Sequence, residues 1–451
     1  MFSEPVTLPS GADAVGVPLR HSPPWRRAHY TARRAISADA TNGKADVSRR
    51  APASEAAIRR AVKRRLWNAP QTFRAVCAPG LETLLAGEVR ALPDVADVAA
   101  HAGSVRFVAP FDAIYAALLR LRCADEVRVR VGELPAGNFA ILRDHLARLA
   151  WSLWLPGRCA LDVRVRSRAS RVRDDAGLER VVRQAVHDHG VDDGAEDGPP
   201  LTVRLQVSHD RAEAWLDAAG TPLHRRRGER WLAPTSLRET TAAALCLAGL
   251  DRDADLVVDP FCGSGTLIEE AVSFLDGACP GAQREFALAS SPAWAPGRMR
   301  HARRTFCAEP PRSAAGFVAS DVDSDALTAA RRNLERTGLS ERVELDRGDA
   351  RDTPLFDLAA RHGARRPVLL SNPPYGRRAD ARGAEPDALL RQVLEGAAGW
   401  RFALLYPRPE VLGRLPGVQV ERVAHVRIRG LRTALVTGSV EAAPVREGGA
   451  A

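Results

Sequence analysis

Residues 254–270 read ADLVVDPFCGSGTLIEE, and this stretch decides the fold of the chain. Its apolar run predicts a buried strand over residues 254–259, and the spacing of apolar residues that follows predicts a helix over residues 264–275. Between the two, Gly263 and Gly265 would let a ligand approach the backbone, and the start of the helix favours an anionic group. The Gly-Lys-Ser/Thr of a nucleotide-binding P-loop does not follow. A tight strand–helix turn without a ligand is the alternative for this stretch taken alone.

The sequence around this stretch alternates between strand and helix patterns. Such alternation predicts a parallel sheet with right-handed crossovers, so residues 231–441 are expected to form one doubly wound α/β domain. Ligands of such sheets bind beyond the carboxyl ends of the strands. The expected strands are 316–321, 343–345, 367–371, 401–406, 419–428 and 432–440, and the expected helices are 237–249, 324–337 and 386–398.

Two aspartates stand at the ends of the next two expected strands. Asp321 ends the second strand, where a carboxylate is placed to accept hydrogen bonds from both ribose hydroxyls of a nucleoside. Asp349, with Ala350 beside it, follows the third strand, where the carboxylate could accept from the amino group of adenine. Because exposed aspartates are common in loops, each of them taken alone could equally be a cap or turn residue.

A fourth motif, SNPPYG at residues 371–376, ends the fourth strand. The side-chain oxygen of Asn372 and the carbonyl of Pro373 can both accept hydrogen bonds from one –NH2 group. Those bonds would orient the amine and leave its lone pair pointed at an electrophilic methyl group. Tyr375 offers a stacking face for a planar target base. A proline-rich turn without chemistry is the alternative.

The N-terminal half carries a different pattern. Strand and helix patterns alternate between residues 72 and 123 and again between residues 161 and 217, which predicts two small α/β units within residues 69–230. In an extended strand the side chains of Arg164, Arg166 and Arg168 share one face. These three arginines are candidate phosphate contacts, and the solvated face of a sheet is the alternative.

Most of the net positive charge of the chain lies in its first 72 residues. The chain has 451 residues and a net charge of +10, of which residues 1–72 contribute +8 through eleven arginines and two lysines against five acids. Residues 1–68 are expected to form a disordered basic tail, and residues 442–451 a flexible C-terminus. A solvated tail, a start codon placed too far upstream and a targeting peptide all remain open for residues 1–68.

Cysteine usage and hydropathy point to a cytoplasmic protein. The seven cysteines are scattered without a C-x-x-C pair, which predicts reduced core thiols, neither a disulfide framework nor a metal site. No apolar run reaches the roughly 20 residues of a membrane-spanning helix, so membrane contact is not expected.

The four motifs of the C-terminal half resemble those of class I S-adenosylmethionine-dependent methyltransferases. The resemblance implies that the Gly263/Gly265 turn holds the methionine part of the cofactor, with Asp259 and Pro260 as further cofactor-binding residues. It also implies that Asp321 holds the ribose and that Asp349 with Ala350 holds the adenine. The N-P-P-Y form of the fourth motif implies an amine nitrogen as methyl acceptor, on adenine, guanine or a glutamine side chain.

The N-terminal half resembles that of THUMP-containing RNA guanine-N2 methyltransferases. The resemblance rests on residues 77–82 (CAPGLE), 103–107 (GSVRF) and 216–226 (LDAAGTPLHRR) and covers residues 72–441. It is nearest to the RlmL-type 23S ribosomal RNA enzymes and the related tRNA (guanine-N2) methyltransferases. It implies a Rossmann-like catalytic domain preceded by an α+β ferredoxin-like/THUMP module that grips RNA, with Arg225 and Arg226 as further candidate RNA contacts.

Three alternatives remain open at this point. They are a tRNA guanine-N2 methyltransferase, a DNA adenine methyltransferase and a non-catalytic RNA-binding protein. The chain also departs from the family pattern after Tyr375, where Gly376-Arg377-Arg378 stands in place of Gly-Glu-Arg. That departure affects the choice of target and leaves the expected cofactor chemistry unchanged.

Overall fold

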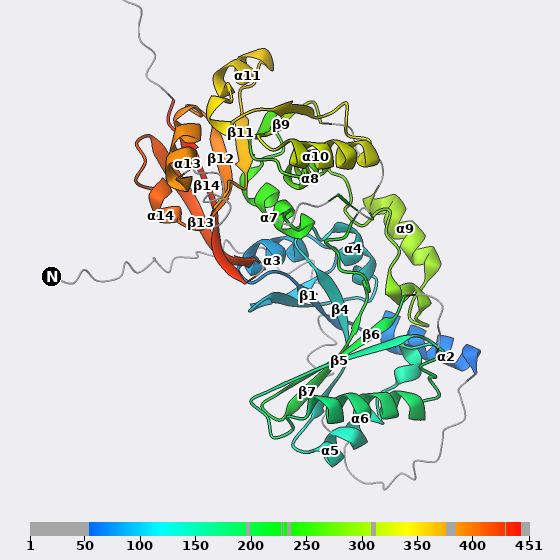
Figure 1. Cartoon of the computed structure of the whole chain (residues 1–451). Coiled ribbons are helices and arrows are strands. Elements are labelled where there is room, and N and C mark those ends of the chain that lie inside the picture. The colour runs from blue at the N-terminus through cyan, green and yellow to red at the C-terminus, as the bar shows by residue number, and fades with distance from the viewer. Residues whose placement is uncertain are drawn as a thin grey trace, which may run out of the picture. The chain divides into compact units, whose positions relative to one another are not determined.

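The computed structural model describes most of the chain (Figure 1). The described residues are 54–194, 199–226, 228, 230–231, 236–307, 313–375, 385–428 and 430–442. They contain two seven-stranded sheets, one in each half of the described chain. None of the helices among them is both long and apolar enough to cross a membrane.

The first sheet has the strand order β2-β3-β1-β4-β7-β6-β5. Its first four strands and helices α3 and α4 follow the chain order βαββαβ, which makes this half of the sheet ferredoxin-like. Phe73 of β1 lies opposite Phe107 of β3, and both rings are fully buried beneath the helices. The bounds are β1 Gln71–Val76, α3 Glu82–Arg90, β2 Ala96–His101, β3 Ser104–Ala109, α4 Ala113–Arg120 and β4 Glu126–Pro135.

The two α/β units expected in this half share the sheet. Strand β4 was not predicted; it has ten residues and pairs with β1 on one side and with β7 on the other. Strands β5 and β6 are the one parallel pair recorded among the paired strands of this sheet. The remaining elements are α5 Phe139–Leu146, β5 Leu161–Arg168, α6 Asp175–Asp188, β6 Leu201–Ser208 and β7 Arg211–Asp217.

The second sheet confirms the predicted doubly wound α/β fold. Its strand order is β10-β9-β8-β11-β12-β14-β13. Strands β10, β9, β8, β11 and β12 are parallel to one another. Strand β14 pairs antiparallel with β12 on one side and with β13 on the other. Successive strands run outward from β8 in one direction and from β11 in the other, so the topological switch point lies between β8 and β11. The bounds are β8 Leu256–Asp259, β9 Gly316–Asp321, β10 Glu344–Arg347, β11 Pro367–Ser371, β12 Arg401–Tyr406, β13 Val418–Ile428 and β14 Leu431–Val440.

Helices connect these strands. Helix α8 follows the glycine turn, α10 follows β9 and α13 follows β11, as the sequence pattern predicts. Helix α9 lies between α8 and β9 in a segment for which no helix was predicted. The bounds are α7 Glu239–Gly249, α8 Thr266–Leu275, α9 Pro296–Phe306, α10 Ser324–Thr337, α11 Leu355–Arg361, α13 Pro386–Glu395 and α14 Pro409–Leu412.

Buried polar groups join the two halves. The guanidinium of Arg122, which follows α4, donates to the carbonyl oxygen of Ser273 in α8 at 3.0 Å. The hydroxyl of Thr240 in α7 donates to the carboxylate of Asp125 at 2.8 Å. Because buried hydrogen-bonding groups are costly to separate, these contacts fix the first sheet to the half that carries the four sequence motifs.

The prediction of a disordered tail over residues 1–68 is wrong for its last part. Helix α2 (Glu55–Val62) begins at Ser54, whose side chain accepts from the backbone N–H of Ala57, and it continues into a π-helical turn, η2 (Lys63–Trp67). Val62 and Leu66 are buried, so this segment packs on the core although its other face is highly charged. The remainder of the tail, residues 1–53, lies outside the described residues, as do residues 443–451 of the expected flexible C-terminus.

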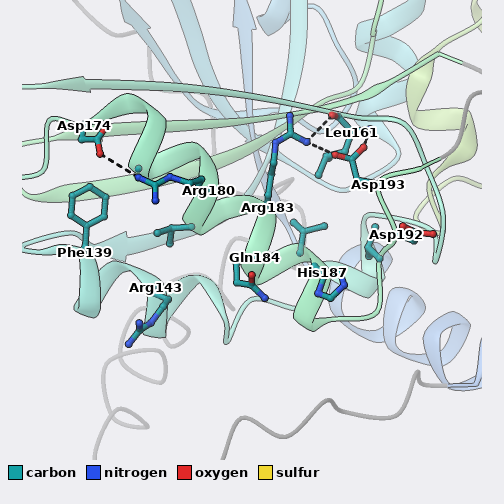
Figure 2. Close-up of a pocket in the computed structure, with 14 residues that line it drawn as sticks. Phe139, Arg143, Leu161, Asp174, Arg180, Arg183, Gln184, His187, Asp192 and Asp193 are labelled. Atoms are coloured by element: carbon teal, nitrogen blue, oxygen red, sulfur yellow. Dashed lines mark hydrogen bonds and ion pairs between the residues drawn. The ribbon is translucent and has the colours of Figure 1, made fainter.

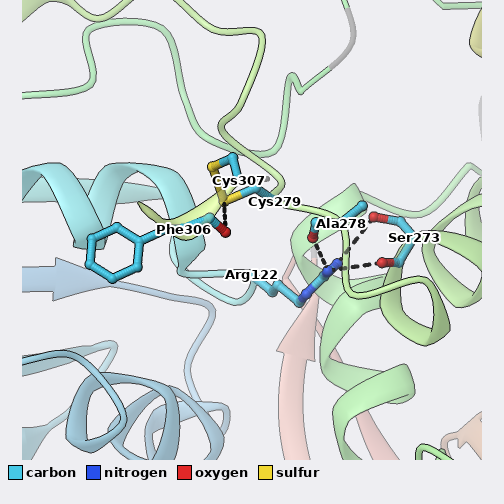
Figure 3. Close-up of a disulfide and its surroundings, with 6 residues drawn as sticks. All are labelled: Arg122, Ser273, Ala278, Cys279, Phe306 and Cys307. Carbon is cyan, nitrogen blue, oxygen red and sulfur yellow. Dashed lines mark hydrogen bonds between the residues drawn. A yellow bond between two sulfur atoms is a disulfide. The ribbon is translucent and has the colours of Figure 1, made fainter. Parts of the chain in front are cut away.

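The prediction that all seven cysteines are reduced is also wrong. Cys279 and Cys307 form a disulfide that closes the segment carrying α9 (Figure 3). The two cysteines are 28 residues apart, so the sequence offered no spacing motif for the pair. The other five cysteines are buried free thiols. No group of three or more potential metal ligands occurs among the described residues.

Thiol titration checks this pairing. The denatured protein is expected to react with five equivalents of a thiol reagent before reduction and seven after it, because only Cys279 and Cys307 are paired. A Cys279→Ser/Cys307→Ser double variant is expected to give five equivalents in both states. Seven equivalents from the unreduced wild-type protein would contradict the disulfide.

Candidate active site

A cavity of about 510 Å³ lies at the carboxyl ends of strands β8, β9, β10 and β11. Four of the residues expected at the site, Pro260, Asp321, Asp349 and Ala350, line it together. Pro374 from the fourth motif lines it too, so all four sequence motifs meet at one edge of the sheet. The complete lining is Pro260, Phe261, Asp321, Val322, Asp323, Asp349, Ala350, Arg351, Pro374 and Leu389.

The glycine turn has the backbone that its residues predict. Gly263 and Gly265 have φ values of 55° and 82°, in the left-handed region that side chains rarely adopt. A Cβ on Gly265 would also lie 3.4 Å from the Cβ of Ala330 in α10. A side chain at position 265 would therefore strain the turn through its left-handed backbone, while its contact with Ala330 would be an ordinary van der Waals contact.

Asp321 connects this turn to the second strand. Its carboxylate is 6% exposed and accepts from the backbone N–H of Gly263 and of Asp323, both at 3.0 Å. Sequence reasoning missed Asp323, which also lines the cavity and caps the N-terminus of α10. Its signal was a second aspartate directly before a helix, the usual place of an N-cap.

The carboxylate of Asp349 accepts hydrogen bonds from its neighbour Arg351. Its carboxylate accepts from the backbone N–H and from the guanidinium Nε of Arg351, each at 2.9 Å. These hydrogen bonds from Arg351 lower the pKa of Asp349 below its ordinary value. A carboxylate offers about four lone-pair positions, so Asp349 keeps capacity for a ligand while Arg351 holds it in place.

Asp259 is the most deeply buried acid of the four motifs. It is 1% exposed, accepts from the Ser371 hydroxyl at 2.6 Å and from the backbone N–H of Phe261 at 3.1 Å, and does not line the cavity. Burial raises the pKa of this carboxyl to about 7, although the Ser371 hydrogen bond lowers it. Asp259 thus ties the glycine turn to the strand that precedes Asn372.

Stability should depend on the ionisation of Asp259. Because its folded-state pKa of about 7 exceeds the ordinary value of 3.8, folding favours the protonated acid, and the free energy of unfolding falls as pH rises between these values. Asp259→Asn removes this titration. The difference in Tm, variant minus wild type, is therefore expected to increase between about pH 5 and pH 8 by roughly 2 °C or more. An equal difference at both pH values in thermal unfolding would contradict the buried ionisation.

Asn372 presents an acceptor without a partner. Its Oδ1 atom is buried and receives no hydrogen bond from any of the described residues. Pro373 and Pro374 on its C-terminal side are buried, and Tyr375 is half-buried. A buried acceptor that stays unsatisfied costs free energy, and Asn372 stands two residues before Pro374, which lines the cavity. Arg377 and Arg378 lie outside the described residues.

Asn333 is a second residue that sequence reasoning missed. It is fully buried in α10, and its amide donates to the carbonyl oxygens of Ser264 at 3.0 Å and Trp231 at 2.9 Å. Its oxygen accepts from the backbone N–H of Trp231 at 3.1 Å. Asn333 therefore holds the glycine turn from behind. The available signal was an asparagine on the apolar face of an amphipathic helix.

The candidate RNA contacts fall into exposed arginines and one buried arginine. Arg164, Arg166 and Arg168 are exposed along β5, as their spacing predicts, and Arg164 pairs with Asp162. Arg225 is exposed. Arg226 is contradicted as an RNA contact, because it is 5% exposed and forms an ion pair with the buried Glu270 of α8.

A larger cavity of about 880 Å³ lies beside α5 and α6 in the first half (Figure 2). None of the four motifs contributes to its lining. Its charges are largely paired within the wall, because Arg183 contacts Asp193 and the carbonyl of Leu161 while Arg180 pairs with Asp174. The smaller cavity, which residues from all four motifs line, is therefore the candidate active site.

Two known protein families match the two halves of the chain separately. Residues 226–400 match the RMKL-like methyltransferase domain, and residues 72–128 match the RlmL ferredoxin-like domain. The four sequence motifs lie in the first match, and strands β2, β3 and all but the first residue of β1 lie in the second.

Individual relatives point the same way. "Putative RNA methyltransferase YpsC" of Bacillus subtilis is 30% identical over 322 residues, which are 68% of this chain and 80% of that protein. "Ribosomal RNA large subunit methyltransferase K/L" of Syntrophotalea carbinolica is 29% identical over 370 residues, which are 76% of this chain. The chain spans about half the length of that K/L relative, 50% by coverage.

A solved structure confirms the fold. The crystal structure of SMU.472 complexed with SAH superimposes with a TM-score of 0.69 and 25% identity, covering 84% of this chain and 99% of that one. The predicted cofactor class is confirmed by the methyltransferase family match. The chain therefore belongs to the RlmL-type family of RNA methyltransferases, which use S-adenosylmethionine as methyl donor.

Proposed function

We propose that the chain methylates the exocyclic 2-amino group of a guanine in structured RNA. The observation that carries this proposal is the buried Oδ1 atom of Asn372, which has no hydrogen-bond partner among the described residues. It is followed by Pro373, whose carbonyl supplies a second acceptor. An exocyclic amine carries two N–H donors, which match these two acceptors.

The cavity is suited to hold the methyl donor. Asp321 and Asp323 present carboxylates for hydroxyl groups, and Phe261, Val322 and Leu389 present apolar surface for a planar ring. The volume of about 510 Å³ is in the range of cofactor pockets. Bound there, S-adenosylmethionine supplies a sulfonium methyl group that is already electrophilic.

The residues of this chain would then act by positioning. Asn372 and Pro373 orient the amine, so that its lone pair points along the line of attack. Tyr375 stacks on the base, which must be turned out of its helix to reach the site. Holding both reactants in line supplies most of the catalysis, because no covalent intermediate is needed. The proton released from nitrogen passes to solvent after transfer.

The N-terminal half is proposed to supply the RNA contacts. Residues 69–230 would act as a ferredoxin-like/THUMP module, with Arg164, Arg166, Arg168 and Arg225 as contacts to phosphates, and residues 231–441 would form the catalytic domain. Large-subunit ribosomal RNA is the substrate proposed first, because the K/L relative carries that function in its name. A tRNA guanine is the alternative.

Nucleoside mass spectrometry of a deletion strain tests this function. Loss of N2-methylguanosine from 23S ribosomal RNA, restored by the wild-type gene, is the expected result. Loss from tRNA alone would select the alternative substrate. Unchanged N2-methylguanosine in both pools would contradict the proposal, and loss of N6-methyladenine from DNA would replace it with the adenine reaction.

A further inference from the structure

Two basic helical segments far apart in the sequence adjoin in the structure. The segment 55–67, made of α2 and η2, carries five cations against the single acid Glu55. Helix α9 carries four arginines in eleven residues and no acidic residue. Neither segment belongs to the cofactor cavity or to the arginines predicted on β5.

Trp67 holds the two segments together. Its indole N–H donates to the carbonyl oxygen of Ala293, just before α9, at 3.3 Å. The guanidinium of Arg298 in α9 stacks over the same indole ring, 4.9 Å from its centroid. Val62 and Leu66 are buried on the inner face of the first segment. The cations on its other face therefore lie on a fixed support and need little ordering to bind a ligand.

Most of these cations have no acidic partner among the described residues. Arg59 pairs with Glu55, Arg298 with Asp112 and Arg303 with Glu285. The other six are exposed and form no ion pair within the described part of the chain. We call these six residues the helical basic surface: Arg60, Lys63, Arg64, Arg65, Arg300 and Arg304.

We propose that the helical basic surface binds the phosphate backbone of the RNA substrate. The proposal rests on the proposed function, because it assigns a second contact area for the same substrate. Exposed, unpaired arginines suit phosphate oxygens, and releasing the counterions of the RNA would drive the binding. Such contacts carry no sequence information, so this surface would position the RNA while the cavity selects the base.

The composition of the surface favours RNA over a protein partner. Protein interfaces centre on buried aromatic or apolar anchors. The large hydrophobic residues exposed among the described residues are Phe139, Ile141, Trp231, Val322, Phe356, Val423 and Leu431. None of them lies on α2, η2 or α9. An acidic protein partner would therefore find no exposed large hydrophobic side chain on these helices.

Salt-dependent binding of a labelled hairpin RNA tests the surface. The test variant is Arg64→Gln/Arg65→Gln/Arg300→Gln/Arg304→Gln. The matched control removes four exposed arginines elsewhere in the catalytic half, Arg331→Gln/Arg361→Gln/Arg365→Gln/Arg414→Gln. Thermal unfolding and the Kd for S-adenosylmethionine show whether each variant is folded.

The test variant is expected to bind the hairpin about tenfold or more weakly at physiological salt. The slope of log Kd against log salt should fall by about 0.7 to 0.9 for each phosphate that the variant no longer neutralises. The control should keep the wild-type slope, and both should bind S-adenosylmethionine as the wild type does.

Two results would overturn the inference. If the test variant keeps the wild-type affinity and slope, the surface does not bind RNA, and an acidic protein is then the partner to seek. If the control is weakened as much as the test variant, the effect is one of net charge. Failure of the wild-type protein to bind any RNA would instead count against the proposed function, and the inference would fall with it.

Discussion

Replacing Asn372 with alanine is expected to lower kcat for methyl transfer about 100- to 1000-fold, the range seen when one preorganised polar group is removed from an active site. The buried Oδ1 atom of Asn372 accepts no hydrogen bond from the described residues, so in the proposed function it accepts from the target amine, and alanine cannot replace it. The Kd for S-adenosylmethionine should stay within about twofold of wild type, because Asn372 does not line the cofactor cavity. Single-turnover transfer to RNA and calorimetric binding of the cofactor measure the two quantities.

A matched change elsewhere separates this effect from a general loss of structure. Gln419 in β13 is exposed, and its side-chain amide donates to Glu441. Gln419→Ala therefore also removes a side-chain amide, at a position outside the four motifs. It is expected to leave both transfer and cofactor binding unchanged. Transfer by Asn372→Ala at a rate within threefold of wild type would remove the acceptor role on which the proposed function depends.

The strands that carry the site were predictable because their signals are local. Strands β9 and β11, which lead to Asp321 and to the fourth motif, are short apolar runs bounded by polar or turn residues, and the structure has them at the predicted residues. In a parallel sheet the carboxyl ends of neighbouring strands share one edge. Placing Asp321, Asp349 and the fourth motif at strand ends was therefore enough to bring them together.

The segments that were missed depend on tertiary contacts. Helix α9 buries only Met299 and Ala302 among its eleven residues, so its apolar pattern is too sparse to read as a helix. Helix α2 is only eight residues long and is followed by Trp67, whose indole contacts a residue 226 positions away. Short helices of this kind are marginal alone, and packing stabilises them.

Two adjacent arginines show that tertiary contacts also decide the burial of single side chains, which local sequence does not predict. Arg225 and Arg226 are indistinguishable in sequence, yet one is exposed and the other is buried against Glu270. The partner comes from α8, 44 residues later in the chain. Likewise, Asn333 supports the glycine turn only because α10 packs behind it. Local patterns locate the strand ends, and long-range contacts decide which polar residues support them.

Replacing Asp321 with alanine is expected to weaken S-adenosylmethionine binding about 100-fold or more. The change removes a cavity-lining carboxylate and leaves the backbone N–H groups of Gly263 and Asp323 without their acceptor. Each buried donor left unsatisfied costs about 1–3 kcal/mol, so two such penalties cost about 2–6 kcal/mol, a range that includes the roughly 2.7 kcal/mol that corresponds to 100-fold. Calorimetric titration with the cofactor measures the change, and Asp357→Ala, an exposed change on α11, is the control.

The two variants should fail in opposite ways. Asp321→Ala is expected to raise the KM for S-adenosylmethionine, so saturating cofactor should restore much of its transfer rate, because the acceptors at Asn372 and Pro373 remain in place. Asn372→Ala binds the cofactor normally, so additional cofactor should not restore transfer. If saturating cofactor rescued Asn372→Ala, or if Asp321→Ala bound the cofactor as tightly as wild type, the division of the site into a cofactor cavity and an amine-binding turn would be wrong.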